Sequence, residues 1–246
     1  SGNTAVGNVS LYCNTTGADN TAVGFCSLRA NTTGTRNVAV GKSAFLSSTT
    51  ASDSVMIGFT AGDAITTGTS NTGVGSDVMT STTTGNKNIA MGGSTLGTNT
   101  TGSCNTAVGF QSMLANTTSD NNTAFGYKAL FTQTDAGARN TAIGLCALHG
   151  NTSGDDNVAV GYGAGDSNTT GSSNISVGSG ALATSTTASN NTAVGNIALF
   201  DSTTASGNTA IGAAALTNQT TGVNNVVVGA CASYTSTTAE YSTIVG

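Results

Sequence analysis

The stretch Asn3-Thr4-Ala5-Val6-Gly7 is the unit from which this chain is built. It returns as Asn20-Thr21-Ala22-Val23-Gly24 and as Asn37-Val38-Ala39-Val40-Gly41, and its closing glycine recurs through the whole sequence. The interval is seventeen residues at every step except from Gly126 to Gly144, where it is one residue longer. A constant period over an entire chain is the signature of a repeat architecture.

The positions of the repeat are numbered here from its asparagine, so the first copy runs from position 1 at Asn3 to position 17 at Asp19. Position 1 is Asn in all copies except those that begin at Ser54 and Ser242. Position 4 is always apolar, position 5 is always Gly, and position 13 is Thr in every complete copy. The β-branched residues at positions 2 and 4 are typical of a strand, and the glycine after them permits the bend that ends it.

A single repeat is too small to bury its apolar side chains alone, whereas stacked repeats can bury them against one another. We therefore predict an all-β fold, a parallel β-solenoid of 14 to 15 coils with seventeen residues per coil. Residues 1–246 are expected to form one repeat domain that is an excerpt of, or a unit in, a longer array. The expected core comprises positions 4 and 9 and part of position 2. The small residues at positions 3 and 8 let another surface come close, so either the coil is flattened upon itself or these rows face sister chains. A second short strand or extended segment is expected at positions 8 and 9, with a helical turn as the alternative.

Stacking also predicts ladders, because equivalent polar side chains then lie above one another and hydrogen-bond along the stack. In the first three copies the predicted ladder residues are Asn3, Asn20, Asn37, Thr15, Thr32 and Thr49. The corresponding corner glycines are Gly7, Gly24 and Gly41. The extra residue of the eighth copy is expected to form a loop bulge around residues 135–139.

Composition argues against several functions. Charged residues make up 7% of the chain and the net charge is −5, so no basic surface for nucleic acid is expected. No long uninterrupted apolar run occurs, which predicts no membrane insertion. His149 is the only histidine and is expected to be an exposed surface residue, and no cluster of metal ligands is apparent. The sequence thus predicts no catalytic site, no metal site and no cofactor.

The five cysteines show no paired spacing and are interpreted as small packing residues. A bridge between Cys13 and Cys26, or bridges between chains, remain alternatives to that interpretation.

Glycosylation is a more specific signal. Position 12 completes an Asn-x-Thr/Ser sequon in six copies, although a chain so rich in Asn, Ser and Thr also forms sequons by chance. Because these asparagines fall beside a turn, where glycans can be attached, they are candidate sites of covalent glycans. The candidates are Asn14, Asn31, Asn99, Asn116, Asn151 and Asn168.

The pattern Asn-x-Ala-Val-Gly-x-x-Ala-Leu resembles the head repeats of trimeric autotransporter adhesins. In those proteins Val-Ala-Ile-Gly-x-x-Ala units build a left-handed parallel β-roll that packs as a trimer. The pattern is also similar to arrays in predicted phage and algal-virus fibre proteins. The resemblance covers nearly the whole chain and implies a fibre or adhesin, but it is a likeness of repeats and implies no binding site. The adhesin repeat is also shorter than the repeat of this chain, so a single-chain solenoid that polymerises end to end fits equally well.

These observations predict a non-enzymatic extracellular structural protein, the shaft or head of a fibre, filament or adhesin on a cell or virion surface. Its expected partner is itself, as an end-to-end filament or a homotrimer. The alternative is a fibre module that binds a receptor or glycan through the variable positions 6 and 10, and a second alternative is an ice-binding solenoid. Aromatic residues at the variable positions are interpreted first as lateral packing between chains; they are Phe25, Phe59, Phe110, Tyr127, Phe131, Tyr162 and Phe200.

Overall fold

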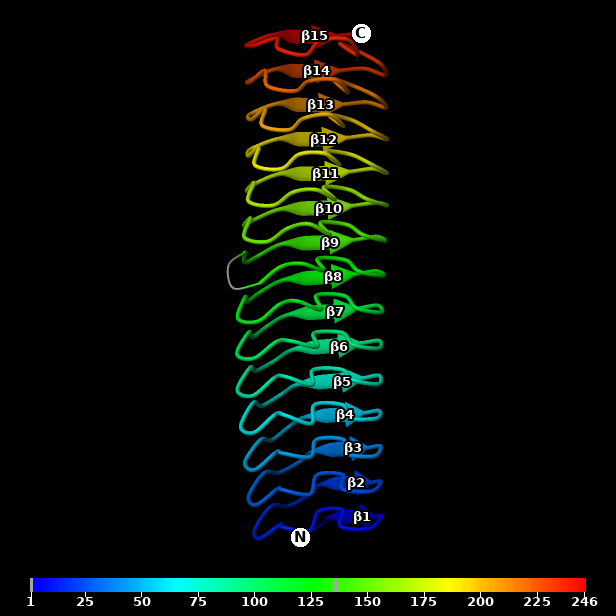
Figure 1. Ribbon diagram of the computed structural model, residues 1–246, viewed down its shortest axis with the longest axis vertical. Helices are drawn as coiled ribbons and strands as arrows, with labels where there is room; N and C mark the ends of the chain where they lie inside the picture. The colour runs from blue at the N-terminus through cyan, green and yellow to red at the C-terminus, as the bar shows by residue number, and fades with distance from the viewer. Residues whose placement is uncertain (1, 135–136) are drawn as a thin grey trace. The chain divides into compact units, whose positions relative to one another are not determined.

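The computed structural model describes residues 2–134 and 137–246. Those residues form strands, turns and bends, and none of them is helical. The chain divides into two compact units, residues 1–121 and 122–246, which are called unit 1 and unit 2. In each unit the coils stack one strand upon the next, which confirms the predicted parallel β-solenoid (Figure 1).

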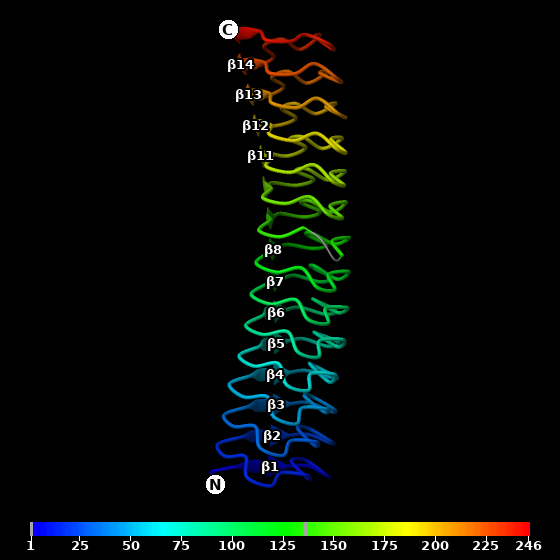
Figure 2. The same cartoon turned by 90° about the vertical axis from the view of Figure 1, so that its left-hand side faces the viewer.

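Each copy of the repeat contributes one three-residue strand at positions 2 to 4. The strands of unit 1 are β1 (Thr4–Val6), β2 (Thr21–Val23), β3 (Val38–Val40), β4 (Val55–Ile57), β5 (Thr72–Val74), β6 (Ile89–Met91) and β7 (Thr106–Val108). The strands of unit 2 are β8 (Thr123–Phe125), β9 (Thr141–Ile143), β10 (Val158–Val160), β11 (Ile175–Val177), β12 (Thr192–Val194), β13 (Thr209–Ile211), β14 (Val226–Val228) and β15 (Thr243–Val245). Figure 2 shows β11 to β14 gathered along one side of their coils, with the turns on the other side.

Consecutive strands within a unit pair in parallel, each residue beside its equivalent. Ala22 of β2, for example, lies between Ala5 of β1 and Ala39 of β3. The longer spacing in the eighth copy does not shift the register, since Thr123 of β8 still pairs with Thr141 of β9. The extra residue is therefore accommodated outside the strands. Two of the five residues predicted to form the bulge, 135 and 136, lie outside the described residues.

The strand side chains point in the direction opposite to the prediction. Position 3 faces the interior, where Ala22 and Ala39 are fully buried, whereas the flanking Val23 and Val40 face outward and are partly exposed. The prediction that position 4 and part of position 2 form the core is thus wrong. Positions 3 and 8 are buried within the single chain, as at Ala22 and Ser27, so of their two predicted environments the flattened coil fits and the contact with sister chains does not. The strand turns its small side chain inward because little volume remains inside the coil, which is already filled by Leu28 at position 9 and by asparagines at positions 1 and 12. Only a small side chain fits between them and the strand.

The prediction of a buried apolar row at position 9 is correct, but the backbone there is neither a strand nor a helix. Positions 7 and 9 are left-handed turn residues, as at Cys26 (φ 57°) and Leu28 (φ 49°). The N–H of Leu28 donates to the carbonyl of Ala44 in the following coil at 2.9 Å, while Ser43 donates back to Phe25 at 2.8 Å. The left-handed conformation costs roughly 1–2 kcal/mol per residue, and these inter-coil hydrogen bonds offset it.

Candidate functional site

The asparagines of position 1 form the predicted ladder, although their partners are backbone groups. The side-chain oxygen of Asn3 accepts the N–H of Asn20 at 2.9 Å, and that of Asn20 accepts the N–H of Asn37 at 3.0 Å. Each side-chain amide also crosses its own coil, so Asn20 donates to the carbonyl of Gly34 at 2.9 Å. Each asparagine of this row therefore links its coil to the next one and also connects the two sides of its own coil.

The threonines of position 13 form the second predicted ladder. The hydroxyl of Thr15 donates to the carbonyl of Thr32 at 2.8 Å, that of Thr32 to Thr49 at 2.9 Å, and that of Thr49 to Thr66 at 3.2 Å. The backbone N–H of Thr15 donates to the same carbonyl at 2.9 Å. The hydroxyls of this row are thus committed to holding coils together.

The corner glycines are required by both conformation and space. Gly7, Gly24 and Gly41 have φ values of 129°, 133° and 134°, which L side chains rarely adopt. A Cβ on Gly24 would lie 2.5 Å from the carbonyl oxygen of Gly41 and 2.7 Å from its carbonyl carbon. No larger residue fits there without moving the next coil.

The position 12 asparagines do not suit glycosylation. Asn31, Asn99, Asn116, Asn151 and Asn168 are buried in the coil, and the amide of each donates to the carbonyl of position 15 in its own coil. An N-linked glycan needs that nitrogen and open space around it, so the prediction does not fit this structure. Asn14 makes the same hydrogen bond, to Gly17 at 3.0 Å, but is only half-buried, so at that residue glycosylation stays a prediction.

Instead, these asparagines form a side-chain ladder that the sequence did not reveal. The amide of Asn31 donates to the side-chain oxygen of Asn14 at 2.8 Å, and that of Asn168 to Asn151 at 2.8 Å. Where position 12 is asparagine, the two rows share one acceptor in the coil: Gly34, for example, accepts from both Asn20 and Asn31, at 2.9 and 3.1 Å. The sequence did not distinguish the two roles, because an asparagine at this position is compatible both with a sequon and with a hydrogen-bonded ladder inside the coil.

The first surface with functional potential is the outer side of the strands, formed by positions 2 and 4 and called the strand face. It carries Thr, Val, Ile, Met and Phe, and no charged residue in any coil. Several of its side chains are more than a third exposed, among them Met91 (44%) in unit 1 and Phe125 (55%) and Ile211 (41%) in unit 2. Contiguous exposed apolar side chains are uncommon on folded proteins and are often found where a partner docks.

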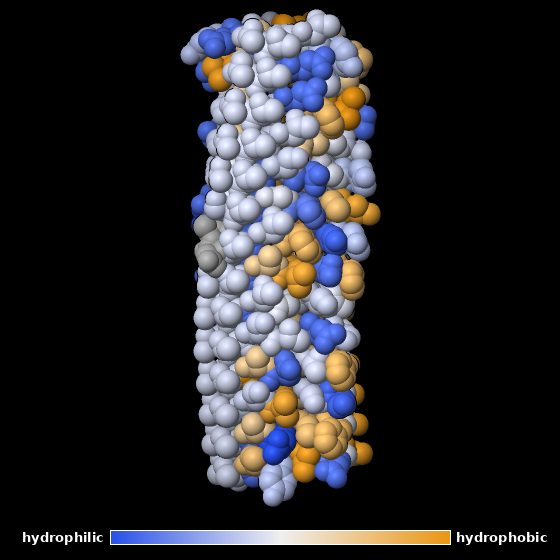
Figure 3. All heavy atoms as spheres, in the orientation of Figure 1, coloured by the Kyte–Doolittle hydropathy of each residue, from blue (hydrophilic) through white to orange (hydrophobic). Residues whose placement is uncertain are grey.

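The second surface is formed by positions 6, 7 and 10 and is called the variable face. The aromatic residues predicted to face outward at position 6 do so: Phe25 (51%), Phe59 (49%), Phe110 (49%), Tyr127 (46%) and Tyr162 (65%) are exposed. Figure 3 shows one side of the molecule, where pale, regularly repeated rows adjoin an irregular area of apolar and hydrophilic side chains.

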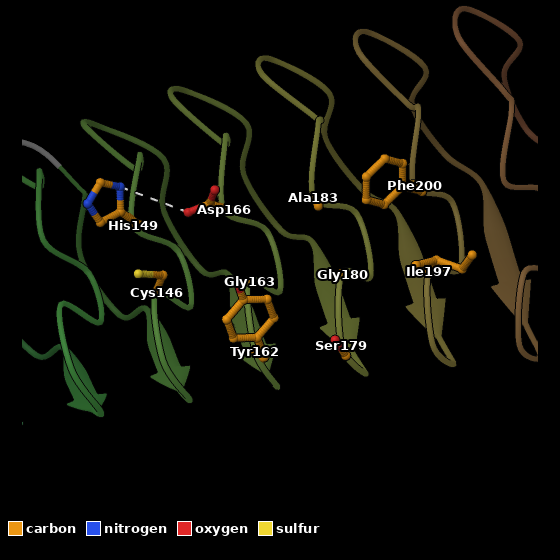
Figure 4. Close-up of a pocket in the computed structure, with 10 residues that line it drawn as sticks. All are labelled: Cys146, His149, Tyr162, Gly163, Asp166, Ser179, Gly180, Ala183, Ile197 and Phe200. Atoms are coloured by element: carbon orange, nitrogen blue, oxygen red, sulfur yellow. Dashed lines mark ion pairs between the residues drawn. The ribbon is translucent and has the colours of Figure 1, made fainter.

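A groove of about 510 Å³ opens on the variable face of unit 2. Its lining comes from four consecutive coils and consists of Cys146, His149, Tyr162, Gly163, Asp166, Ser179, Gly180, Ala183, Ile197 and Phe200 (Figure 4). The hollow exists because position 7 is glycine in the tenth and eleventh copies, at Gly163 and Gly180, and position 10 of the eleventh copy is Ala183. That run of small residues is the signal from which the sequence could have located it.

Charge in the groove centres on one carboxylate. Burial raises the pKa of Asp166, and His149 acts against that rise from 3.9 Å. Burial also raises the pKa of the Cys146 thiol, with Asp166 adding to the rise. His149 is only partly exposed, at 34% of its side chain, and stacks on Phe131 with 5.1 Å between ring centroids and 3° between the planes. It is therefore less exposed than predicted.

Sequence reasoning also missed the pairing of position 17 between coils. Arg36 reaches Asp53 at 2.6 Å, and Arg139 reaches Asp156 at 2.6 Å, all with exposed side chains. The five cysteines are free thiols, and Cys26 is buried, so the packing interpretation fits that residue while Cys13, Cys104 and Cys231 are exposed.

Comparison with known proteins matches the chain to no family model and to no curated protein. Among residues 2–134 and 137–246, no group of three or more His, Cys, Asp or Glu side chains is placed to hold a metal ion. The same residues contain no helix long and apolar enough to cross a membrane.

Proposed function

We propose that this chain is a structural, non-enzymatic component of a fibre, filament or adhesin, and that copies of it associate side by side through the strand face. The observation that carries the proposal is the uncovered, uncharged strip of β-branched and apolar side chains on the outer side of the strands. Water contact with such a strip is unfavourable at about 25 cal/mol per Å² of apolar surface, so a partner that covers it gains that free energy.

A second copy of the chain is the partner that fits best. Its strand face has the same spacing between rows, about 4.8 Å, so side chains of one copy interdigitate with those of the other along the whole contact. In unit 2 the face presents two outward side chains on each of eight strands, and flanking residues extend it to the roughly 20–30 residues per side of a standard interface. The strand backbone is already paired within the sheet, so the contact relies on side chains alone.

Lateral association favours the homotrimer or another side-by-side assembly over a purely end-to-end filament. The likeness of the repeat to adhesin head repeats, together with a surface rich in Thr, Ser and Asn, supports a place outside the cell on a cell or virion surface. In this proposal the aromatic residues of the variable face are left for other partners.

The test introduces charge into the strand face and compares it with charge elsewhere in the same coils. Val177→Lys with Ile211→Lys places two cations on the strip, and Thr187→Lys with Thr221→Lys places them on exposed turn residues at position 14. We expect the native chain and the turn variant to sediment as the same oligomer, and the strand-face variant to sediment as a monomer. Circular dichroism verifies that both variants keep the fold. A native chain that stays monomeric at its solubility limit would refute the proposal.

Ice binding is the second candidate. In unit 1 position 14 is an exposed threonine in all seven coils, which gives a single regular file of hydroxyl and methyl groups. Position 13 contributes less, because its hydroxyls donate to the next coil. If the file binds ice, the purified chain shows thermal hysteresis that Thr50→Lys with Thr67→Lys removes. Absence of hysteresis in the native chain rejects this candidate.

A further inference from the structure

The column of side chains at position 10 in unit 2 shows how rings stack on this fold. Phe131 and His149 lie in adjacent coils, and their rings are nearly parallel with centroids 5.1 Å apart. That distance is close to the spacing between coils, roughly 4.8 Å. Two rings in successive coils of this column therefore meet at stacking distance without any adjustment of the backbone.

Further along the same column, one coil has no ring at position 10, so the space that a ring would occupy there is open. Asp166, Ala183 and Phe200 occupy position 10 in three successive coils, and Ala183 contributes only a methyl group (Figure 4). Phe200 bounds the space on one side, and its ring lies 3.5 Å from where a Cβ on Gly180 would be. The space over Ala183 thus lies between the aromatic side chain of Phe200 and the carboxylate of Asp166.

Polar groups surround this space in an arrangement that suits hydroxyl groups. The Asp166 carboxylate accepts hydrogen bonds, while the hydroxyls of Ser179 and Tyr162 on the opposite wall both donate and accept. No lysine or arginine lines the groove, and the carboxylate repels anions. A ligand therefore needs a ring with an apolar face, several hydroxyls at its edge and no negative charge.

We propose that this groove binds a neutral saccharide, with one sugar ring over Ala183 against Phe200 and its hydroxyl groups on Asp166, Ser179 and Tyr162. A neighbouring sugar extends along the groove over Gly163, where an added Cβ would meet no atom within 4 Å. The binding site lies on the variable face and goes beyond the proposed structural role, because it does not depend on association through the strand face. The groove volume of about 510 Å³ falls within the range of small-molecule sites.

The experiment measures binding of cellotriose, chitotriose and maltotriose to the purified chain by isothermal titration calorimetry. At least one of the three is expected to bind. Ala183→Phe places an aromatic ring in the open space at position 10, where Phe131 and Phe200 already stand in other coils. It should therefore abolish binding without unfolding the coil. Phe200→Ala removes the aromatic face and Asp166→Ala removes the hydrogen-bond acceptor, and each should weaken binding about tenfold.

Tyr234→Ala is the matched control, because Tyr234 is an exposed aromatic residue (47%) at position 10 outside the groove. It should leave binding unchanged. Adenosine tests whether any planar ring is accepted. The proposal is overturned if none of the three saccharides binds, if Ala183→Phe binds as the native chain does, or if adenosine alone binds. Since monomeric strand-face variants keep the groove, the same titration on Val177→Lys with Ile211→Lys separates this result from the outcome for assembly.

Discussion

The interior of each coil has two halves that follow different rules. The polar half consists of positions 1, 12 and 15, where asparagine amides meet the carbonyl of position 15. The apolar half consists of positions 3, 8 and 9, where Ala, Ser, Leu, Met and Phe pack. Position 1 of the polar half is Asn in all but two copies, although position 12 also carries Ser, Thr, Gln and Ile. In the apolar half, large and small residues exchange between positions 3 and 9 in some copies. Hydrogen bonds depend on distance and angle, but dispersion and burial depend mainly on filled volume.

The fourth and fifth coils show how the apolar half exchanges volume. In the fourth coil, position 9 is Gly62 in place of a large side chain, and position 3 is Met56 in place of Ala. A Cβ on Gly62 would lie 2.6 Å from the sulfur of Met56 and 3.0 Å from Cδ1 of Ile65. In the next coil, a Cβ on Gly73 would lie 2.8 Å from the same sulfur. Met56 therefore occupies the space that two other residues leave.

The largest expected effect breaks this exchange. Gly62→Leu alone places a second large side chain on Met56, and Met56→Ala alone leaves a cavity, so each should lower the free energy of unfolding by about 3 kcal/mol. The double variant restores the common pattern of Ala at position 3 and Leu at position 9, and should recover most of that loss. Leu is compatible with the left-handed backbone at position 9, as Leu28 demonstrates (φ 49°).

The measurement is a double-mutant cycle by urea denaturation, read together with hydrogen exchange in the fourth coil. Additive losses in the double variant would show that the two sites do not share one volume.

The second prediction applies the same test to the polar half. Asn157 accepts the N–H of Asn174 at 3.0 Å and donates to Gly171 at 2.9 Å, while it is almost fully buried. Asn157→Ala removes both bonds and leaves a buried N–H unpaired, which should cost about 2–3 kcal/mol. Asn157→Ser should cost about half as much. Ser54, which replaces Asn in the fourth coil, still accepts the N–H of Asn71 at 3.1 Å.

The readout is hydrogen exchange of the Asn174 amide, which should become fast in the alanine variant and stay slow in the serine variant. Equal exchange in both would mean that the accepted N–H does not govern this row.

The sequence predicted the period, the parallel coils, the corner glycines and the ladders of positions 1 and 13. Each of these depends on the same residue recurring at the same position of the repeat. It could not predict which side of a three-residue strand faces inward. The alternation of side chains along a strand shows that Ala22 faces away from Thr21 and Val23, but not which of the two sides faces inward. The inward side depends on how much space Leu28 and the asparagines occupy across the coil. The groove escaped prediction for a related reason: its signal in the sequence is only the run of small residues Gly163, Gly180 and Ala183, and whether such a run leaves a hollow depends on the side chains of the neighbouring coils.

The third prediction repairs a gap in the polar half. The asparagine ladder of position 12 stops where Asn168 is followed by Ser185, and the side-chain oxygens of both are buried without a hydrogen-bond partner. Ser185→Asn brings an amide to the oxygen of Asn168, as Asn168 itself does for Asn151 at 2.8 Å. The variant should gain about 1 kcal/mol of stability, measured by urea denaturation. Ser185→Ala is its control: it removes the unpaired hydroxyl but leaves the oxygen of Asn168 without a donor, so it should gain less than the asparagine variant. A loss in the asparagine variant would mean that the space between these coils is already filled, for example by water.

The smallest expected effect lies outside both halves, in the exposed pair of Arg36 and Asp53. Two contacts join the side chains, at 2.6 and 2.8 Å, and the hydrogen bond from Arg36 holds the pKa of Asp53 below its usual value. Because the folded carboxyl has the lower pKa, the contribution is present above the unfolded pKa and is lost as pH falls through the folded one. Arg36→Ala should therefore shift the thermal midpoint by no more than about 2 °C at neutral pH and by nothing in acid.

Lys87→Ala is the matched control for this pair, since Lys87 occupies the same position 17 and has the same φ of 56° as Arg36. It changes the backbone preference in the same way but removes no ion pair. The two variants should differ at neutral pH and coincide in acid, as followed by circular dichroism. A large destabilisation by Arg36→Ala that persists in acid would place the role of Arg36 in its packing against the neighbouring coil. Position 17 would then contribute to stability by packing, as the residues of the coil interior do, and not only by surface charge.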